Sequence, residues 1–163
     1  MPTMGAPDLP PALVEQLEDL ADPMWRLRNL YWIIDDNAKE LQFVPNPEQE
    51  QFLGSMWFYN LILKARQLGF TSLMAIFGLD QAMWVPNYRV VMIAETEEKA
   101  KKIFDTKVVY AWEKLPQWIK DINPLVRKTA SRMEFSNGAF IEVTVSARSG
   151  TCDLLHISEF GKI

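Results

Sequence analysis

The sequence has 163 residues, of which 48% are hydrophobic and 12% aromatic, and its formal net charge is −4. This is enough apolar chain for one compact domain, and it excludes a disordered segment or a repeat array. No apolar run reaches the roughly 18 residues that suggest a membrane-spanning helix. The acidic balance gives no support for strong nucleic-acid binding by charge alone.

The sequence contains one cysteine, Cys152, and one histidine, His156. A single cysteine cannot form an internal disulfide, so a reducing compartment is expected. One cysteine and one histidine also exclude an ordinary structural zinc site. We interpret Cys152 as a packed thiol and His156 as a buried neutral residue.

The first part of the chain, residues 1–40, predicts a helical segment ahead of the main domain. Leucines recur at helical spacing over 11–21, which predicts a short amphipathic helix. Asp22 suits an N-cap with Pro23 in the first turn of a second helix. The apolar positions that follow extend this second helix over 24–34.

The main domain is expected over 41–163. After a short apolar element, two prolines delay the next helix, which is predicted over 48–60. Gln49 lies near its start, and a side-chain amide can donate to and accept from an adenine edge at once. Gln51 is the alternative in register, and an ordinary exposed helix glutamine is the other interpretation.

A polar turn over 64–70 separates an apolar run, 61–63, from a helix predicted over 71–84. Strand, polar turn and helix form the context of a phosphate-binding loop, because backbone N–H groups and the positive helix end point at the anion. The same order also arises in proteins that bind no nucleotide, and that interpretation stays open here.

The turn fits half of the loop pattern G-x-x-x-x-G-K-[ST]. Gly69 and Thr71 match its second half, whereas Phe70 stands in place of the lysine and offers only backbone N–H and packing. Thr71 is the expected magnesium ligand, with helix capping as its other role. Lys64, at the loop's start, has a stem long enough to replace the missing lysine, and Arg66 is a second cation. Either cation could equally be a surface charge.

Two further units complete the predicted fold. A buried strand over 88–94 precedes a helix that begins after Thr96 and runs to about 115. After an irregular stretch, 116–129, the Asn-Gly dipeptide at 137–138 predicts a β-hairpin with a type I′ turn. Strands and helices in this order predict an α/β fold with right-handed crossovers and a mainly parallel sheet.

The last apolar run, 153–159, reads as a buried parallel strand, and α/β sheets bind ligands at the carboxyl ends of such strands. A nucleotide-hydrolysing P-loop protein needs a second strand ending in Asp-Glu, for magnesium and for the attacking water. Glu159 fits the second role, with a local salt bridge as the competing interpretation. Ser158 occupies the first, and its neutral hydroxyl would hold magnesium less firmly. Arg148 lies in the polar loop before this strand.

Three segments together resemble a known family: Phe-x-Pro-Asn-Pro-x-Gln over 43–49, Lys-Ala-Arg-Gln-Leu-Gly-Phe-Thr-Ser over 64–72, and Ser-Gly-Thr-x-x-x-Leu-His-Ile-Ser-Glu-Phe-Gly over 149–161. From about residue 22 onward the chain is similar to the N-terminal ATPase part of the large terminase subunit of tailed bacteriophages. The resemblance implies a P-loop NTPase fold, ATP and Mg²⁺ as cofactors, and ATP hydrolysis coupled to translocation of double-stranded DNA. It implies as partners a small terminase subunit, a portal protein and further copies of the chain in a ring, in the host cytoplasm as a phage or prophage protein.

The resemblance also implies roles for individual residues. Glu159 would position the attacking water, Arg148 would act as a finger on the next subunit's nucleotide, and Thr71 and Ser158 would hold the metal. The nucleotide-binding residues implied are Gln49, Lys64, Arg66, Gln67, Leu68, Gly69, Phe70, Thr71 and Ser72.

A complete motor has further strands and a nuclease domain that this sequence does not hold. We therefore expect an incomplete, C-terminally truncated P-loop domain with one β-hairpin, which hydrolyses ATP weakly or not at all. Two alternatives remain: an inactive terminase remnant that acts as a binding module, and another P-loop ATPase of the helicase-like kind.

Overall fold

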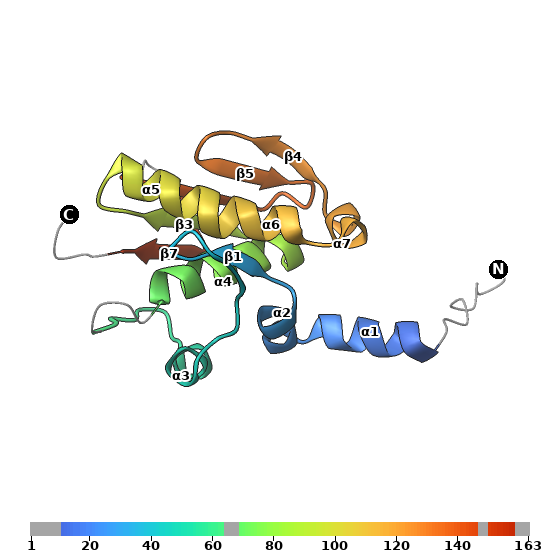
Figure 1. Ribbon diagram of the computed structural model, residues 1–163. Coiled ribbons are helices and arrows are strands. Elements are labelled where there is room, and N and C mark those ends of the chain that lie inside the picture. Colours follow the sequence, from blue (N-terminus) through green and yellow to red (C-terminus); the bar gives the residue numbers. More distant parts are fainter. Residues whose placement is uncertain (1–10, 64–68, 147–149, 159–163) are drawn as a thin grey trace.

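The computed structural model describes residues 11–63, 69–146 and 150–158. These residues form an α/β structure in which helices flank one five-stranded mixed sheet, and a two-stranded hairpin stands apart from it (Figure 1). The elements before Gly69 are α1 (Pro11–Ala21), α2 (Pro23–Asn29), β1 (Trp32–Ile34), β2 (Glu40–Gln42) and α3 (Pro47–Ser55). Those after it are α4 (Phe70–Trp84), β3 (Arg89–Ile93), α5 (Glu97–Ile103), the π-helix η1 (Phe104–Val109), α6 (Tyr110–Lys114), α7 (Gln117–Ile122), β4 (Leu125–Lys128), β5 (Arg132–Phe135), β6 (Phe140–Thr144) and β7 (Leu154–Ile157).

The five-stranded sheet has the order β4-β5-β6-β3-β7. Strand β3 is parallel to β6 and to β7, and Val90 is the register partner of Ile141 on one side and of Leu154 on the other. Strand β5 is antiparallel to both β4 and β6. The sheet is therefore mixed, where the sequence predicted a mainly parallel one, because the β5–β6 hairpin and β4 extend it on the β6 side.

Helix α4 forms the centre of the hydrophobic core. Its close approach to the sheet depends on Gly78, because a Cβ there would lie 2.8 Å from Val90 Cγ1 and 3.4 Å from Ile141 Cδ1. The helix also packs against α2 and η1, so most of its surface is covered. Its buried residues are Phe70, Leu73, Met74, Ala75, Ile76, Gly78, Leu79, Asp80, Ala82 and Met83.

The helix predicted after Thr96 is present, and the Thr96 side chain accepts the Lys99 N–H as an N-cap. The helix continues directly from α5 through η1 into α6, but η1 is a six-residue π-helix that the sequence did not predict. The apolar stripe faces inward as expected: Phe104 and Val108 are buried in the core.

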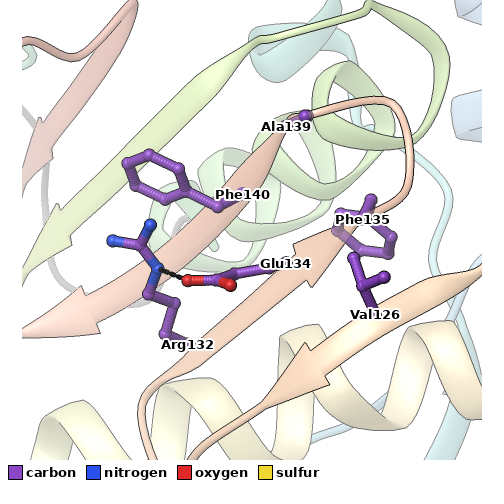
Figure 2. Close-up of a pocket in the computed structure, with 7 residues that line it drawn as sticks. Val126, Arg132, Glu134, Phe135, Ala139 and Phe140 are labelled. Atoms are coloured by element: carbon purple, nitrogen blue, oxygen red, sulfur yellow. Dashed lines mark ion pairs between the residues drawn. The ribbon is translucent and has the colours of Figure 1, made fainter.

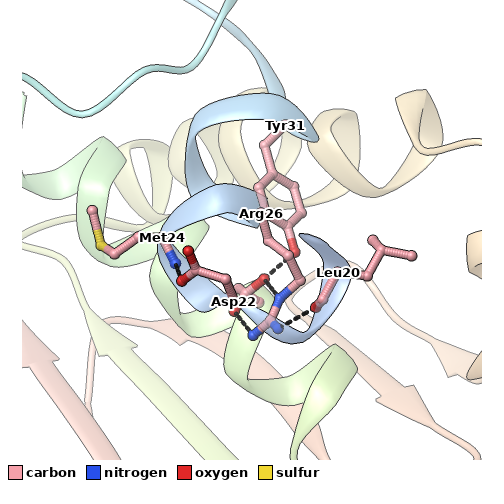
Figure 3. A network of polar contacts seen from close by, with 6 residues as sticks. Leu20, Asp22, Met24, Arg26 and Tyr31 are labelled. Carbon is pink, nitrogen blue, oxygen red and sulfur yellow. Dashed lines mark hydrogen bonds and ion pairs between the residues drawn. The ribbon is translucent and has the colours of Figure 1, made fainter. Parts of the chain in front are cut away.

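A buried polar network joins α2 to α4 (Figure 3). The Arg26 guanidinium donates to both carboxylate oxygens of Asp80 at 2.8 Å and to the Leu20 carbonyl at 2.7 Å. The Tyr31 hydroxyl donates to Asp80 Oδ1 at 2.6 Å. Burial, reinforced by the charge of Asp80, raises the pKa of Tyr31 well above its usual value. Asp22 caps α2 through the Met24 N–H, as predicted.

Several predicted elements differ from the observed ones. The second helix ends at Asn29, and residues 32–34 form β1, which pairs with β2, because three apolar residues fit a short strand as well as a helix turn. The predicted strand over 61–63 is absent: the backbone there is irregular, and Leu61 and Leu63 are 81% and 90% exposed. The segment pairs with no strand of the described sheets, and its two leucines gain no burial that would favour an extended conformation.

Three other differences lie in turns and connections. Helix α3 ends at Ser55, where it was predicted to reach residue 60. The stretch 116–129, predicted as irregular, contains α7 and β4. The β5–β6 hairpin is confirmed, but its turn is not type I′, since Gly138 has a φ of 83° while Asn137 has no positive φ. The Gly138 N–H donates to the Phe135 carbonyl, which fits a type I turn followed by a left-handed glycine.

Among the described residues, no helix combines the length and the apolar character that crossing a membrane requires.

Candidate functional site

The residue that precedes α4 is a left-handed glycine. Gly69 is the N-cap residue, with φ 68° and ψ 17°, a conformation that other residues adopt at a cost. Its carbonyl accepts the Leu73 N–H at 2.9 Å, which is the first hydrogen bond of the helix. Glycine has no side chain to cap α4, and the first turn contains no acidic residue. The positive end of the helix dipole is therefore not balanced by a carboxylate of that turn.

Phe70, in the position of the expected lysine, points into the protein. Its side chain is buried, and its ring packs edge-on against Phe52 of α3, with 5.6 Å between the ring centroids. The role of Phe70 in this turn is packing, which fixes the start of α4 against α3.

The turn lies beside the carboxyl end of β7. The Thr71 and Ser158 hydroxyl oxygens are 3.3 Å apart, although 87 positions separate them in the chain. The Ser158 N–H donates to the Ile93 carbonyl, so Ser158 continues the alignment of β7 with β3. Figure 1 shows the first turn of α4 below the arrowhead of β7, at the left of the view. The two halves of the predicted site are thus brought together by one contact between described residues.

Gln49 connects α3 to the same turn. Its backbone N–H donates to Asn46 Oδ1 at 2.8 Å, and its Oε1 accepts the Asn46 N–H at 3.0 Å, which is a capping box. Its Nε2 donates to the Gly69 carbonyl at 3.1 Å. The side chain is buried, with 4% of the residue's surface exposed.

A hollow of about 250 Å³ opens next to this turn. One wall consists of the β1–β2 hairpin and the segment that follows it, including Phe43 and Val44, and the other consists of Gln49, Gly69 and Ser72. Apolar walls with a few polar groups at one end suit a flat organic ring whose charged part lies at the helix terminus.

Thr71 and Ser158 offer two neutral hydroxyls to a cation. The described parts of the chain contain no group of three or more His, Cys, Asp or Glu side chains placed to hold a metal ion. Magnesium takes oxygen ligands and in phosphate sites relies on one or two carboxylates together with the phosphates themselves. The two hydroxyls therefore fit a magnesium ion that arrives with phosphate, and they do not form a metal site of their own.

The structure brings together five of the predicted site residues. Gln49, Gly69, Thr71 and Ser158 meet at the turn, and Ser72 lines the hollow beside them. Gln51, the alternative to Gln49, is exposed on α3. The predicted residues that lie outside the described residues are Lys64, Arg66, Gln67, Leu68, Arg148 and Glu159.

Two features of the site were not predicted. The capping box had a sequence signal, because an asparagine followed three positions later by glutamine is typical of a helix start. The part played by the β1–β2 hairpin had none, since nothing in its residues indicates that it lies beside Gly69.

A second hollow, of about 220 Å³, lies on the β5–β6 hairpin (Figure 2). Arg132 reaches over it, with Nε 2.8 Å from Glu134 Oε1, Nη1 3.6 Å from Glu142, and its guanidinium 3.7 Å from the Phe140 ring centroid. Two carboxylates thus offset the one cation of this hollow, which gives it no net attraction for an anion.

No family model matches the sequence, and no curated protein is similar to it at a significant level.

Proposed function

We propose that the chain is the ATPase part of a viral DNA-packaging motor, the large terminase subunit of tailed bacteriophages, and that ATP binds at the turn before α4. The observation that carries the proposal is the contact between the hydroxyls of Thr71 and Ser158. It supports the proposal because a phosphate-binding turn and the end of the parallel strand β7 must lie together if both face one triphosphate.

In this proposal the phosphates lie at the N-terminus of α4, where backbone N–H groups and the helix dipole favour an anion. Thr71 and Ser158 hold the Mg²⁺, which neutralises charge that develops on the phosphates. The base occupies the hollow between the β1–β2 hairpin and Gly69. Lys64 and Arg66 supply cations from the preceding loop, Gln67, Leu68 and Ser72 belong to the same phosphate-binding segment, and Glu159 and Arg148 serve catalysis.

The proposal extends to the surroundings of the motor. Double-stranded DNA is the translocated substrate, a small terminase subunit and a portal protein are partners, and the chain assembles as a ring in the host cytoplasm. Hydrolysis by the chain alone is proposed to be weak, because Ser158 offers magnesium a neutral hydroxyl where a carboxylate would bind more firmly.

Calorimetric titration with ATP and ADP, with and without Mg²⁺, tests the proposal. We expect both nucleotides to bind the unsubstituted protein, and Thr71→Val, which keeps the side-chain shape, to weaken binding. Turnover of ATP, measured in parallel, is expected to be slow. Absence of binding by a folded protein at millimolar nucleotide would end the proposal.

A second candidate is a binding module that keeps the fold without hydrolysis. It is favoured by the buried Phe70 in the lysine position and by the hydroxyl of Ser158 in the carboxylate position. Nucleotide binding with no turnover at all, in the presence of DNA and Mg²⁺, would select it. A helicase-like ATPase is less well supported, because its second strand would end in Asp-Glu.

A further inference from the structure

We propose that Gln49 is a positioning residue that holds the Gly69 turn in shape for the phosphates, and that it does not read the base. This inference rests on the proposed function, since it concerns the same site. It replaces the role of adenine reader, which the sequence alone suggested for this glutamine.

Both ends of the Gln49 amide are bonded to backbone groups. Oε1 accepts the Asn46 N–H at 3.0 Å, and Nε2 donates to the Gly69 carbonyl at 3.1 Å. To read an adenine edge, an amide must present its acceptor and its donor to the base together. Each end of the amide has one further hydrogen-bonding position, but the two backbone bonds fix the plane of the amide, and only 4% of the residue is exposed. Turning the amide toward a base would break these bonds, which would leave a buried N–H and weaken the start of the helix.

The carbonyl that Gln49 contacts is the one from which α4 starts. Gly69 O accepts the Leu73 N–H at 2.9 Å and the Gln49 amide at the same time. The contact is also close in space, because a Cβ on Gly69 would lie 3.0 Å from Gln49 Nε2. The orientation of the Gly69 carbonyl, and with it the start of the helix, is therefore held from α3.

This orientation matters because the groups at the start of α4 would face the phosphates. Glycine changes its backbone angles at little cost, so Gly69 itself has several accessible conformations. A bond from a capped helix, α3, selects one of them. Without it, the conformation that presents the N–H groups of α4 is less populated, and apparent affinity falls with that population whatever base the ligand carries.

The test uses Gln49→Met, which keeps the length of the side chain and removes the hydrogen bonds of the amide without adding charge. Gln51→Met, on the exposed part of the same helix, is the matched control. Two properties are measured: amide hydrogen exchange at Leu73 and at Ile141 in the sheet, and calorimetric affinity for ATP, GTP and inorganic tripolyphosphate with Mg²⁺.

We expect exchange at Leu73 to rise roughly tenfold in Gln49→Met, from the loss of a buried hydrogen bond, while exchange at Ile141 is unchanged. Affinity for ATP, GTP and tripolyphosphate should fall by one common factor, and Gln51→Met should change neither property. A loss confined to ATP would assign base reading to Gln49 and overturn the proposal. Equal acceleration at Leu73 and Ile141 would show a general loss of stability and overturn it as well.

The two proposals fail in distinguishable ways. If the unsubstituted protein binds none of the three ligands, the proposed function is wrong. The role of Gln49 is then decided by amide hydrogen exchange at Leu73 alone. A selective increase in exchange at Leu73 then still supports the hold of Gln49 on the turn, whereas unchanged exchange overturns it.

Discussion

Replacing Asp80 with alanine removes the acceptor of two Arg26 hydrogen bonds and of the Tyr31 hydroxyl from the interface between α2 and α4. Asp80 is 0% exposed and Arg26 is 5% exposed, so water cannot replace the lost carboxylate. The guanidinium would keep the Leu20 carbonyl at 2.7 Å and the Trp84 ring at 4.9 Å, neither of which balances its charge. Removing one partner of a buried pair costs about 3–5 kcal/mol.

Such a loss is a large part of the roughly 5–15 kcal/mol by which a domain is stable. For a chain of this length, about 2–4 °C of Tm is lost per kcal/mol, so a loss of about 4 kcal/mol lowers Tm by roughly 8–16 °C. Urea unfolding followed by far-ultraviolet circular dichroism gives the free energy of unfolding, and a thermal melt gives the Tm.

Asp36→Ala is the matched control. Asp36 pairs with Lys102 at 3.1 Å on the surface, and both side chains are more than half exposed. Its loss should cost less than about 1 kcal/mol. Joint replacement of Arg26 by Met and Asp80 by Leu removes both charges and should recover part of the stability lost in Asp80→Ala, since the Tyr31 hydroxyl still lacks its carboxylate acceptor. A cost for Asp80→Ala no larger than that for Asp36→Ala would refute the reasoning.

Three other predictions follow from named contacts. Folding raises the pKa of the Tyr31 hydroxyl above its value in the unfolded chain. The stability that the protonated hydroxyl contributes is therefore fully present below that unfolded pKa and is lost as pH rises above about 10. Tyr31→Phe should remove that part of the alkaline loss in urea unfolding, and identical slopes in both proteins would contradict this. Gly138→Ala places a Cβ 2.2 Å from Asn87 Oδ1 at a φ of 83°, so it should cost about 1–3 kcal/mol, and an unchanged urea midpoint would argue against it. Ser158→Asp should make ATP binding about tenfold stronger with Mg²⁺ than without, by supplying the carboxylate that magnesium prefers, whereas equal affinities would count against a metal at this position.

The sequence predicted the elements whose pattern is long or whose turn chemistry is specific. Helix α4, strand β3 and the β5–β6 hairpin belong to this group. It also placed Thr71 and Ser158 in one site, and their hydroxyls do lie 3.3 Å apart, although the strand over 61–63 that was expected to lead into the turn is absent.

The remaining features depend on tertiary contacts that local patterns do not encode. Residues 32–34 fit a helix face as well as a strand, and only pairing with β2 decides between them. The pairing of Arg26 with Asp80 was not predicted, because neither position indicates a partner 54 positions away in the chain. The bond from Gln49 to Gly69 was not predicted either, since its acceptor is a backbone carbonyl.

Amide chemical-shift mapping with ATP and Mg²⁺ tests the central claim most directly. The claim is that the turn before α4 and the end of β7 form one phosphate site. We predict the largest shift changes at Gly69, Thr71, Ser72 and Ser158, with smaller changes around the hollow at Phe43. Saturating ATP that leaves these amides unshifted, or shifts only residues on the β5–β6 hairpin, would contradict the account.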